Sequence, residues 1–203
     1  MKSKLWFKIF GAGLIILVLA GALGYVSVSQ LKRNAELIVD DTLPGLTFAG
    51  EANAYLADAS RTLLLIVTEN PQRRQEMRDE IKALSQRTTG YLENYKKCIF
   101  EAEDQANYQA LLKERSDYIQ IRERVIALAL EGKKGDALAL YDDSLVPAHK
   151  RVKSAGDRVF EYNMRQGEVR GRRILRICQM TQITVAIVSI VIFIAGFFIG
   201  LFK

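Results

Sequence analysis

The sequence predicts an all-α protein, an up-down-up-down antiparallel four-helix bundle flanked by two transmembrane helices. Residues 9–31 and 177–202 form two runs without a charged residue, and about 20 residues are enough to cross a hydrocarbon core about 30 Å thick. Between them, small or apolar residues recur at alternating spacings of four and three, which is the pattern of packed helices. No stretch of this segment shows the period of two that is typical of strands.

These observations divide the chain into four parts. Residues 1–8 form a short N-terminal segment, residues 9–31 a first transmembrane helix, residues 32–176 the bundle, and residues 177–202 a second transmembrane helix. The formal net charge of +6 belongs mostly to the membrane edges, because the bundle segment holds 25 of the 29 basic residues together with all 23 acidic ones. The basic composition therefore does not indicate nucleic-acid binding.

The charge distribution also predicts an orientation. Lys2, Lys4 and Lys8 precede the first apolar run and favour a cytoplasmic N-terminus. Four arginines between residues 170 and 176 precede the second run and favour the opposite orientation. We expect the N-terminal signal to decide, since long loops translocate largely regardless of their charge. The bundle would then lie outside the cytoplasm.

The first bundle helix is predicted to continue through Pro44. Proline removes a helical hydrogen bond at a cost of roughly 3 kcal/mol, yet the apolar spacing keeps its phase on both sides, so we expect a bend rather than an end. The residues on this seam are Leu31, Ala35, Ile38, Thr42, Gly45, Ala49, Ala52, Leu56, Ala59, Leu63 and Ile66. Asn70 is predicted to cap the next helix, with Pro71 at its first position.

Three further helices complete the predicted bundle. Their seams run from Met77 to Cys98, from Leu111 to Leu128, and from Leu138 to Val169. The last seam includes Leu138, Tyr141, Leu145, Ala148, Val152, Ala155, Val159 and Tyr162, and Pro147 is predicted to bend it as Pro44 bends the first. Between the last two helices, Gly132 is expected to end one and Asp136 to cap the other.

This order of elements resembles the input half of methyl-accepting chemotaxis receptors. The segment TLPGL, residues 42–46, is similar to the Leu-Pro pattern of their four-helix-bundle sensors, and the arginine-rich approach to the second membrane helix is also similar. The same module serves some histidine kinases and cyclic-nucleotide enzymes. Since no coupling domain or methylated hairpin follows within this sequence, we expect either a receptor fragment or a short protein acting through an output partner.

The resemblance implies a function and a location. It implies a homodimer in a bacterial inner membrane, crossing it twice in contact with lipid, with both termini cytoplasmic and the bundle periplasmic. Such a module binds a small organic or amino acid ligand and passes a helix displacement across the membrane. It implies no cofactor and no nucleic-acid partner.

Candidate ligand contacts are Arg61, Arg122 and Ser144, which fall near one height of the predicted bundle together with Glu80. Arginine can hold a carboxylate through two parallel hydrogen bonds. The alternative interpretation is that each arginine is an ordinary solvated side chain.

Catalysis is not predicted. The acidic residues are expected on outer faces without a paired-carboxylate arrangement, and His149, the single histidine, on the surface. The sequence contains no plausible nucleophile–histidine pair or metal-ligand cluster, so we expect no enzymatic activity. Two other functions stay open: a structural membrane-anchored bundle that acts through a protein partner, and a secreted bundle released by cleavage at Ala20-Gly21-Ala22.

Overall fold

The computed structural model describes the backbone of residues 2–201, and the side chains within that range except at residues 2–10, 12, 48–56, 195 and 198–201. The elements of this range are all helical, which confirms the all-α fold. They are α1 (Lys2–Leu37), α2 (Leu43–Val67), α3 (Pro71–Lys96), α4 (Ala102–Leu130), α5 (Lys134–Leu140) and α6 (Val146–Leu201), with two π-helical turns, η1 (Ile38–Thr42) and η2 (Tyr141–Leu145).

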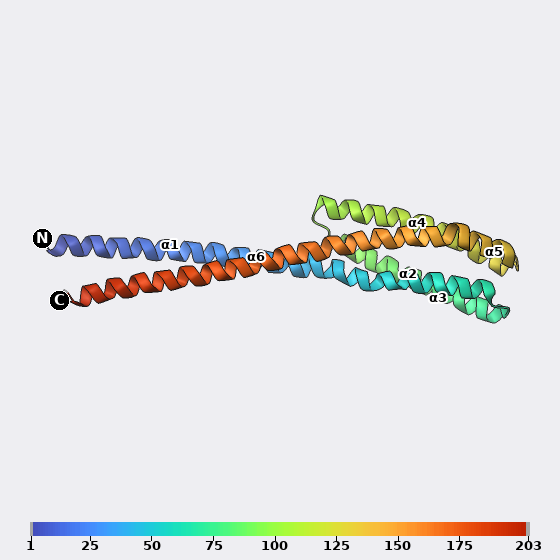
Figure 1. Cartoon of the computed structure of the whole chain (residues 1–203), viewed down its shortest axis with the longest axis horizontal. Coiled ribbons are helices and arrows are strands. Elements are labelled where there is room, and N and C mark those ends of the chain that lie inside the picture. The colour runs from blue at the N-terminus through green and yellow to red at the C-terminus, as the bar shows by residue number, and fades with distance from the viewer. Residues whose placement is uncertain (1, 202–203) are drawn as a thin grey trace. The chain divides into compact units, whose positions relative to one another are not determined.

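The chain divides into two compact units. The helix-pair unit comprises Met1–Ile38 and Glu168–Lys203, and the bundle unit comprises Val39–Gly167. Within the bundle unit, α2 and α4 run in one direction, and α3 and the first part of α6 run in the other (Figure 1). This is the predicted up-down-up-down order. The short α5 and η2 lie between α4 and α6.

Local signals account for the helix ends. The Asn70 side chain accepts hydrogen bonds from the backbone N–H groups of Gln72 and Arg73 at 2.9 and 3.3 Å, as predicted for a cap. Gly132 follows α4 with a φ of 77°, a conformation that glycine adopts without steric cost. Asp136 does not cap α5, because helical bonding begins earlier, with the N–H of Ala137 donating to the carbonyl of Lys133.

The core of the bundle unit draws apolar side chains from every helix. A buried tyrosine, Tyr118, lies among branched aliphatic residues and alanines that are almost fully excluded from solvent. The largest of these aliphatic residues are Leu65, Ile66, Ile81, Leu92, Leu111, Val125, Leu145, Val152 and Val159. Most of them occupy the predicted seams.

The predicted seam is wrong by one residue before each π turn. Ala137 is fully buried whereas Leu138 is only partly buried, and Asn34 is buried whereas Ala35 is exposed. A π-helical turn holds more residues than an α-helical turn. A residue upstream of the turn must therefore lie one position earlier to share a face with Leu145 downstream.

The seam also fails near the end of α2. Leu63 is 36% exposed, while Thr62 and Leu65 are fully buried. The run from Leu63 to Val67 is apolar at every position, so periodicity does not determine which side chains point inward. The seam positions Ala49, Ala52 and Leu56 lie outside the described side chains.

The two prolines that are predicted to bend a helix each lie two residues after a π turn. Pro44 is the second residue of α2 after η1, and Pro147 is the second residue of α6 after η2. At η2, the N–H of Val146 donates to the carbonyl of Tyr141, five residues back. No non-helical residue interrupts the chain between α1 and α2. The bends expected at the two prolines stay predictions.

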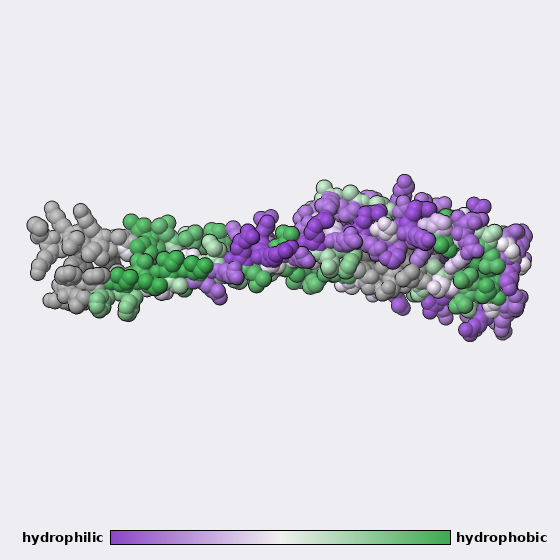
Figure 2. All heavy atoms as spheres, in the orientation of Figure 1, coloured by the Kyte–Doolittle hydropathy of each residue, from purple (hydrophilic) through white to green (hydrophobic). Residues whose placement is uncertain are grey.

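The helix-pair unit contains the two predicted membrane segments. Helical segments within Gly13–Thr47 and Lys134–Ile194 are long and apolar enough to cross a membrane, and their apolar windows are not buried. Hydrophobic residues cover much of the drawn surface of this unit, while hydrophilic residues predominate on the bundle (Figure 2). The guanidinium of Arg170 donates to the carbonyl of Leu37 at 3.0 Å, which joins the two helices. The side chains of Lys2, Lys4 and Lys8 lie outside the described residues.

Candidate functional site

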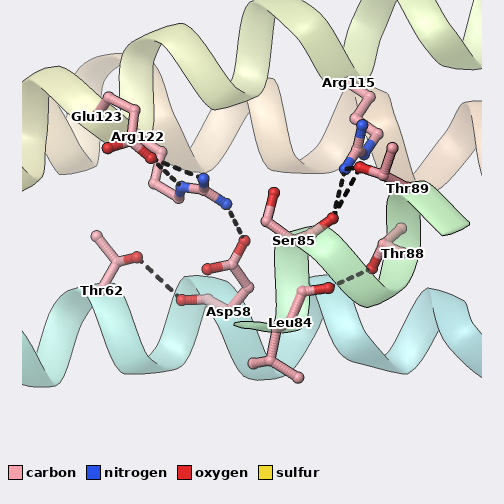
Figure 3. A network of polar contacts seen from close by, with 9 residues as sticks. All are labelled: Asp58, Thr62, Leu84, Ser85, Thr88, Thr89, Arg115, Arg122 and Glu123. Carbon is pink, nitrogen blue, oxygen red and sulfur yellow. Dashed lines mark hydrogen bonds and ion pairs between the residues drawn. The ribbon is translucent and has the colours of Figure 1, made fainter. Parts of the chain in front are cut away.

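A buried ion pair joins α2 to α4 in the bundle unit. The Arg122 guanidinium donates from its NH1 nitrogen to Oδ2 of Asp58 at 2.5 Å, and the two side chains are only 4% and 5% exposed. The NH2 and Nε nitrogens of the same guanidinium both reach Oε1 of Glu123, at 2.7 and 3.3 Å. Glu123 is about half exposed. One arginine thus lies between a buried and an exposed carboxylate (Figure 3).

Burial disfavours the charged forms of both members of this pair, whereas the opposite charge of each partner favours them. Burial raises the pKa of Asp58, although the Arg122 guanidinium counteracts part of this effect. Burial disfavours the charged form of Arg122, but the carboxylates of Asp58 and Glu123 outweigh it and raise its pKa. Oδ1 of Asp58 is buried and accepts no hydrogen bond from the described residues. A buried pair of this kind is weak evidence for stability, since desolvation offsets much of the attraction.

Further polar contacts fix the helices around the pair. The hydroxyl of Thr62 donates to the Asp58 carbonyl at 2.9 Å within α2. About two helical turns before Arg122 on α4, Arg115 donates to the Ser85 carbonyl at 3.0 Å and to the Thr89 hydroxyl at 2.8 Å. Arg115 therefore ties α4 to α3, while Arg122 ties α4 to α2 (Figure 3).

Two clefts open on the surface beside these contacts. The α3–α4 cleft has a volume of about 360 Å³ and is lined by Arg78, Ile81, Lys82, Ser85, Gln86, Thr89, Arg122, Glu123 and Ile126. The α2–α3 cleft has a volume of about 380 Å³ and is lined by Ala57, Ser60, Arg61, Leu64, Arg73, Glu76, Met77 and Glu80. Both volumes suit a small molecule.

The predicted site residues are not brought together in one place. Arg61 forms an ion pair with Glu80 at 2.5 Å and lines the α2–α3 cleft. Arg122 lines the α3–α4 cleft, and the alternative of a solvated side chain is wrong for it. Ser144 lies partly buried in η2 and lines neither cleft. Ligand binding by each of the three stays a prediction.

The expectation that acidic residues lie on outer faces is wrong for Asp41, Asp58 and Asp104, which are buried. Asp58 was missed because it lies off the apolar seam of its helix. A buried arginine on a neighbouring helix stabilises it there, and such a pairing between distant positions leaves no periodic signal. The only hint in the sequence is the small residues Ala57 and Ala59 that flank it.

A second buried polar cluster joins α3, α4 and α6. The Tyr95 hydroxyl donates to Oδ1 of Asp104 at 2.6 Å, and the Asn163 amide donates to the Tyr95 oxygen at 2.7 Å. Burial and the bond to Asp104 raise the pKa of the Tyr95 phenol, so this group stays protonated. Gly45 of α2 packs against the Asn163 amide. This cluster has no cleft among those described above, and we interpret it as structural.

The expectation that His149 lies on the surface is also wrong. Its ring is partly buried and packs at a tilt on the Tyr118 ring, with the centroids 5.9 Å apart. Burial lowers its pKa, with a smaller contribution from the charge of Lys153. Nε2 is buried and has no hydrogen-bond partner among the described residues. His149 comes directly after the buried Ala148 and four residues after the buried Leu145, so its side chain lies at the edge of the core.

Among the described side chains, no group of three His, Cys, Asp or Glu residues is arranged to hold a metal ion. The two cysteines, Cys98 and Cys178, are free thiols.

The architecture defines a class of protein. An antiparallel four-helix bundle, whose first and last helices are continuous with segments apolar enough to cross a membrane, is a membrane-anchored helical module. Residues 1–172 match the family described as a four helix bundle sensory module for signal transduction, and the chain belongs to that family. It is a sensory family and not an enzyme family. A comparison with curated proteins finds no match.

Proposed function

We propose that the chain is the input module of a chemotaxis-type membrane receptor. In this proposal the bundle binds a small organic or amino acid ligand outside the cytoplasm and passes a displacement of one helix across the membrane. The observation that carries the proposal is the uninterrupted helix α6, which runs from Val146 in the bundle unit to Leu201 in the helix-pair unit. A continuous helix transmits a displacement that a flexible linker would absorb.

The energetic requirement for this mechanism is differential binding. A ligand shifts a two-state equilibrium only by the difference between its affinities for the two states. Helix shifts of about 1–2 Å are a known mode of switching. The polar contacts that tie α4 to α2 and to α3 supply interactions that a ligand in a neighbouring cleft could strengthen or weaken.

The topology in this proposal is two-pass. Residues 9–31 and 177–202 cross a bacterial inner membrane, residues 1–8 and the C-terminus are cytoplasmic, and residues 32–176 are periplasmic. The basic residues ahead of the first apolar run support this orientation. Labelling of an engineered Lys113→Cys variant of the full chain by a membrane-impermeant maleimide tests it, with the native Cys98 and Cys178 replaced by serine.

A homodimer is part of the proposal. Leu63, Leu64 and Val67 at the end of α2 are 36 to 50% exposed, which leaves apolar surface for a second copy. Mass measurement of the full chain in lipid nanodiscs tests this. A structural bundle without a ligand would instead co-purify with a stable protein partner.

Thermal unfolding of the full chain in nanodiscs, screened against amino acids and organic acids, tests ligand binding. The proposal predicts that at least one compound raises the melting temperature in a saturable way, because a ligand that binds only the folded state stabilises it by mass action. If no compound does so, the sensory reading of this bundle loses its support. Sequencing of the mature N-terminus separates this outcome from a bundle released by cleavage after Ala22.

A further inference from the structure

We propose that the α3–α4 cleft is a binding site for a small dicarboxylate, and that the Glu123 carboxylate occupies the position on Arg122 that one carboxylate of the ligand takes. The inference rests on the proposed sensory function and names the ligand class and the site. It places the ligand within one copy of the bundle, on the outer side of the buried Asp58–Arg122 pair.

The charge of the cleft favours a dianion. Its lining contains three cationic side chains, Arg78, Lys82 and Arg122, and the buried Asp58 neutralises one of them, so a formal charge of +2 faces a ligand once Glu123 is displaced. Arg78 and Lys82 are exposed and form no ion pair with the described side chains. Two unpaired cations beside a third one repel each other, and a dianion would neutralise them.

Arg122 is held ready for a carboxylate. Asp58 fixes the NH1 nitrogen of its guanidinium from the core side, and the Tyr118 ring lies 5.9 Å from its central carbon. The NH2 and Nε nitrogens both donate to one oxygen of Glu123, Oε1, so this edge of the guanidinium could instead bind both oxygens of a ligand carboxylate through two parallel hydrogen bonds. An arginine fixed in this way loses little conformational freedom when a ligand binds.

Glu123 can leave this position at low cost. Its side chain is 53% exposed, so a displaced carboxylate regains its hydration. It is also the residue next to Arg122 on α4, and the contact between them joins no two helices. A carboxylate from a ligand would restore the same hydrogen bonds to the guanidinium and would add contacts to α3.

The remaining lining suits the rest of such a ligand. Ile81 and Ile126 line the cleft on its core side, and because they are only 1% and 2% exposed, the polar groups make most of the contacts with a ligand. The Ser85 side chain rises from α3 toward α4, between Arg122 and Arg115 (Figure 3). The Ser85 hydroxyl and the Gln86 amide make no hydrogen bond with the described residues, so both can donate to the ligand.

Binding at this position would be felt by α2. Asp58 shares the Arg122 guanidinium, and a dicarboxylate brings one negative charge more than the Glu123 carboxylate that it displaces, so binding changes the electrostatic environment of Asp58. Asp58 belongs to α2, which follows η1 without a non-helical residue. The cleft therefore connects a ligand between α3 and α4 to a third helix.

Isothermal titration of the full chain in nanodiscs with succinate tests the inference. Acetate serves as the matched monoanion, succinamide as the uncharged analogue, and inorganic phosphate as a dianion without a carbon chain. We expect saturable binding of succinate, at least about tenfold weaker binding of acetate, and no binding of succinamide. Absence of succinate binding overturns the inference, and phosphate binding as tight as that of succinate overturns the assignment to a dicarboxylate.

Variants locate the site without disturbing the core. Arg78→Ala and Lys82→Ala should each weaken succinate binding at least about tenfold. Arg87→Ala, an exposed cation on the same helix outside the cleft, should leave it unchanged. Glu123→Gln removes the competing charge and should tighten binding severalfold, which a merely structural role for Glu123 does not predict.

The outcomes separate this inference from the proposed function. Saturable stabilisation by another compound, unaffected by Arg78→Ala and Lys82→Ala, would reject the cleft and keep the sensory role. Succinate binding with unequal effects of Arg78→Ala and Arg87→Ala supports the cleft. If neither succinate nor any compound in the wider screen binds, both proposals fail.

Discussion

The Cα of Gly45 lies so close to the Asn163 side chain that a methyl group at this position would overlap the amide. Asn163 cannot move aside without loss, because its amide donates to the Tyr95 hydroxyl oxygen and to the Val159 carbonyl at 2.7 and 2.9 Å. The residue after Pro44 in the TLPGL segment is therefore fixed as glycine by helix packing. A positive φ is not involved.

Gly45→Ala should lower the free energy of unfolding by about 1–3 kcal/mol, the usual cost of overpacking a core. Circular dichroism of the full chain in detergent, followed against denaturant, measures it. Gly90→Ala on α3 is the matched control, since a methyl group there meets no atom within 4 Å. It should raise stability by about 0.5–1 kcal/mol, because alanine is the better helix former. Equal effects of the two substitutions would contradict the packing argument.

Replacing one member of the Asp58–Arg122 pair should lower the free energy of unfolding more than replacing both members with apolar residues. Asp58→Asn leaves a buried guanidinium without its core-side carboxylate and should lower the free energy of unfolding by about 3–5 kcal/mol. The double variant Asp58→Leu/Arg122→Met replaces both charges with apolar groups and should cost much less than the sum of the single changes. Chemical unfolding of the unchanged chain, the single variants Asp58→Leu and Arg122→Met, and the double variant completes the cycle, with Asp58→Asn measured beside it.

An exposed pair provides the comparison for that cycle. On α6, Nζ of Lys153 lies 2.7 Å from Oδ2 of Asp157, and both side chains are about half exposed. Lys153→Ala should change the free energy of unfolding by less than about 1 kcal/mol. A purely additive cycle at Asp58 and Arg122 would show that the two groups do not interact in the folded chain.

His149 predicts a loss of stability on acidification. Its folded-state pKa lies below the ordinary value of 6.5, so between these two values the unfolded chain binds the proton more strongly. The stabilisation is present above the ordinary pKa and is lost as the pH falls through the folded-state pKa. His149→Gln should therefore flatten the decline in melting temperature between about pH 7 and about pH 5. If the melting temperature of this variant declined with the same slope, the loss of stability on acidification would belong to other titratable groups.

The π turns predict an uneven tolerance to deletion. Removing Asp142, an exposed residue of η2, should convert the turn to α-helix and leave both flanks facing as they do now. Removing Arg158, an exposed residue in the regular part of α6, rotates one flank by about 100° and takes core residues off their face. The Asp142 deletion should keep cooperative thermal unfolding, and the Arg158 deletion should abolish it.

The sequence predicts the fold because three signals coincide. Charge-free runs mark the membrane segments, the apolar spacing marks four helices, and residues such as Asn70 and Gly132 mark their ends. The phase within helices is less predictable. A π turn adds a residue without a recognisable motif, and the positions of Ala137 and Asn34 follow from it.

The candidate site is predictable only in part. Arg122 stands out as a residue capable of binding a carboxylate, but its burial depends on Asp58, which is 64 residues away in the chain and belongs to another helix. The buried Tyr95 hydroxyl likewise bonds to side chains of two other helices, Asp104 in α4 and Asn163 in α6. Such pairings are properties of helix packing, and a single sequence contains no periodic trace of them.

Pro44 and Pro147 each affect the exchange of backbone amide protons with solvent. Proline has no amide proton, and the carbonyl four residues before it loses its usual helical donor. Local opening is easiest where backbone hydrogen bonding is interrupted. Deuterium uptake should therefore be fast around residues 38–46 and 141–149 and slow in the interiors of α3 and α4. Ligand binding that stiffens the bundle would show first as slower uptake at these two places.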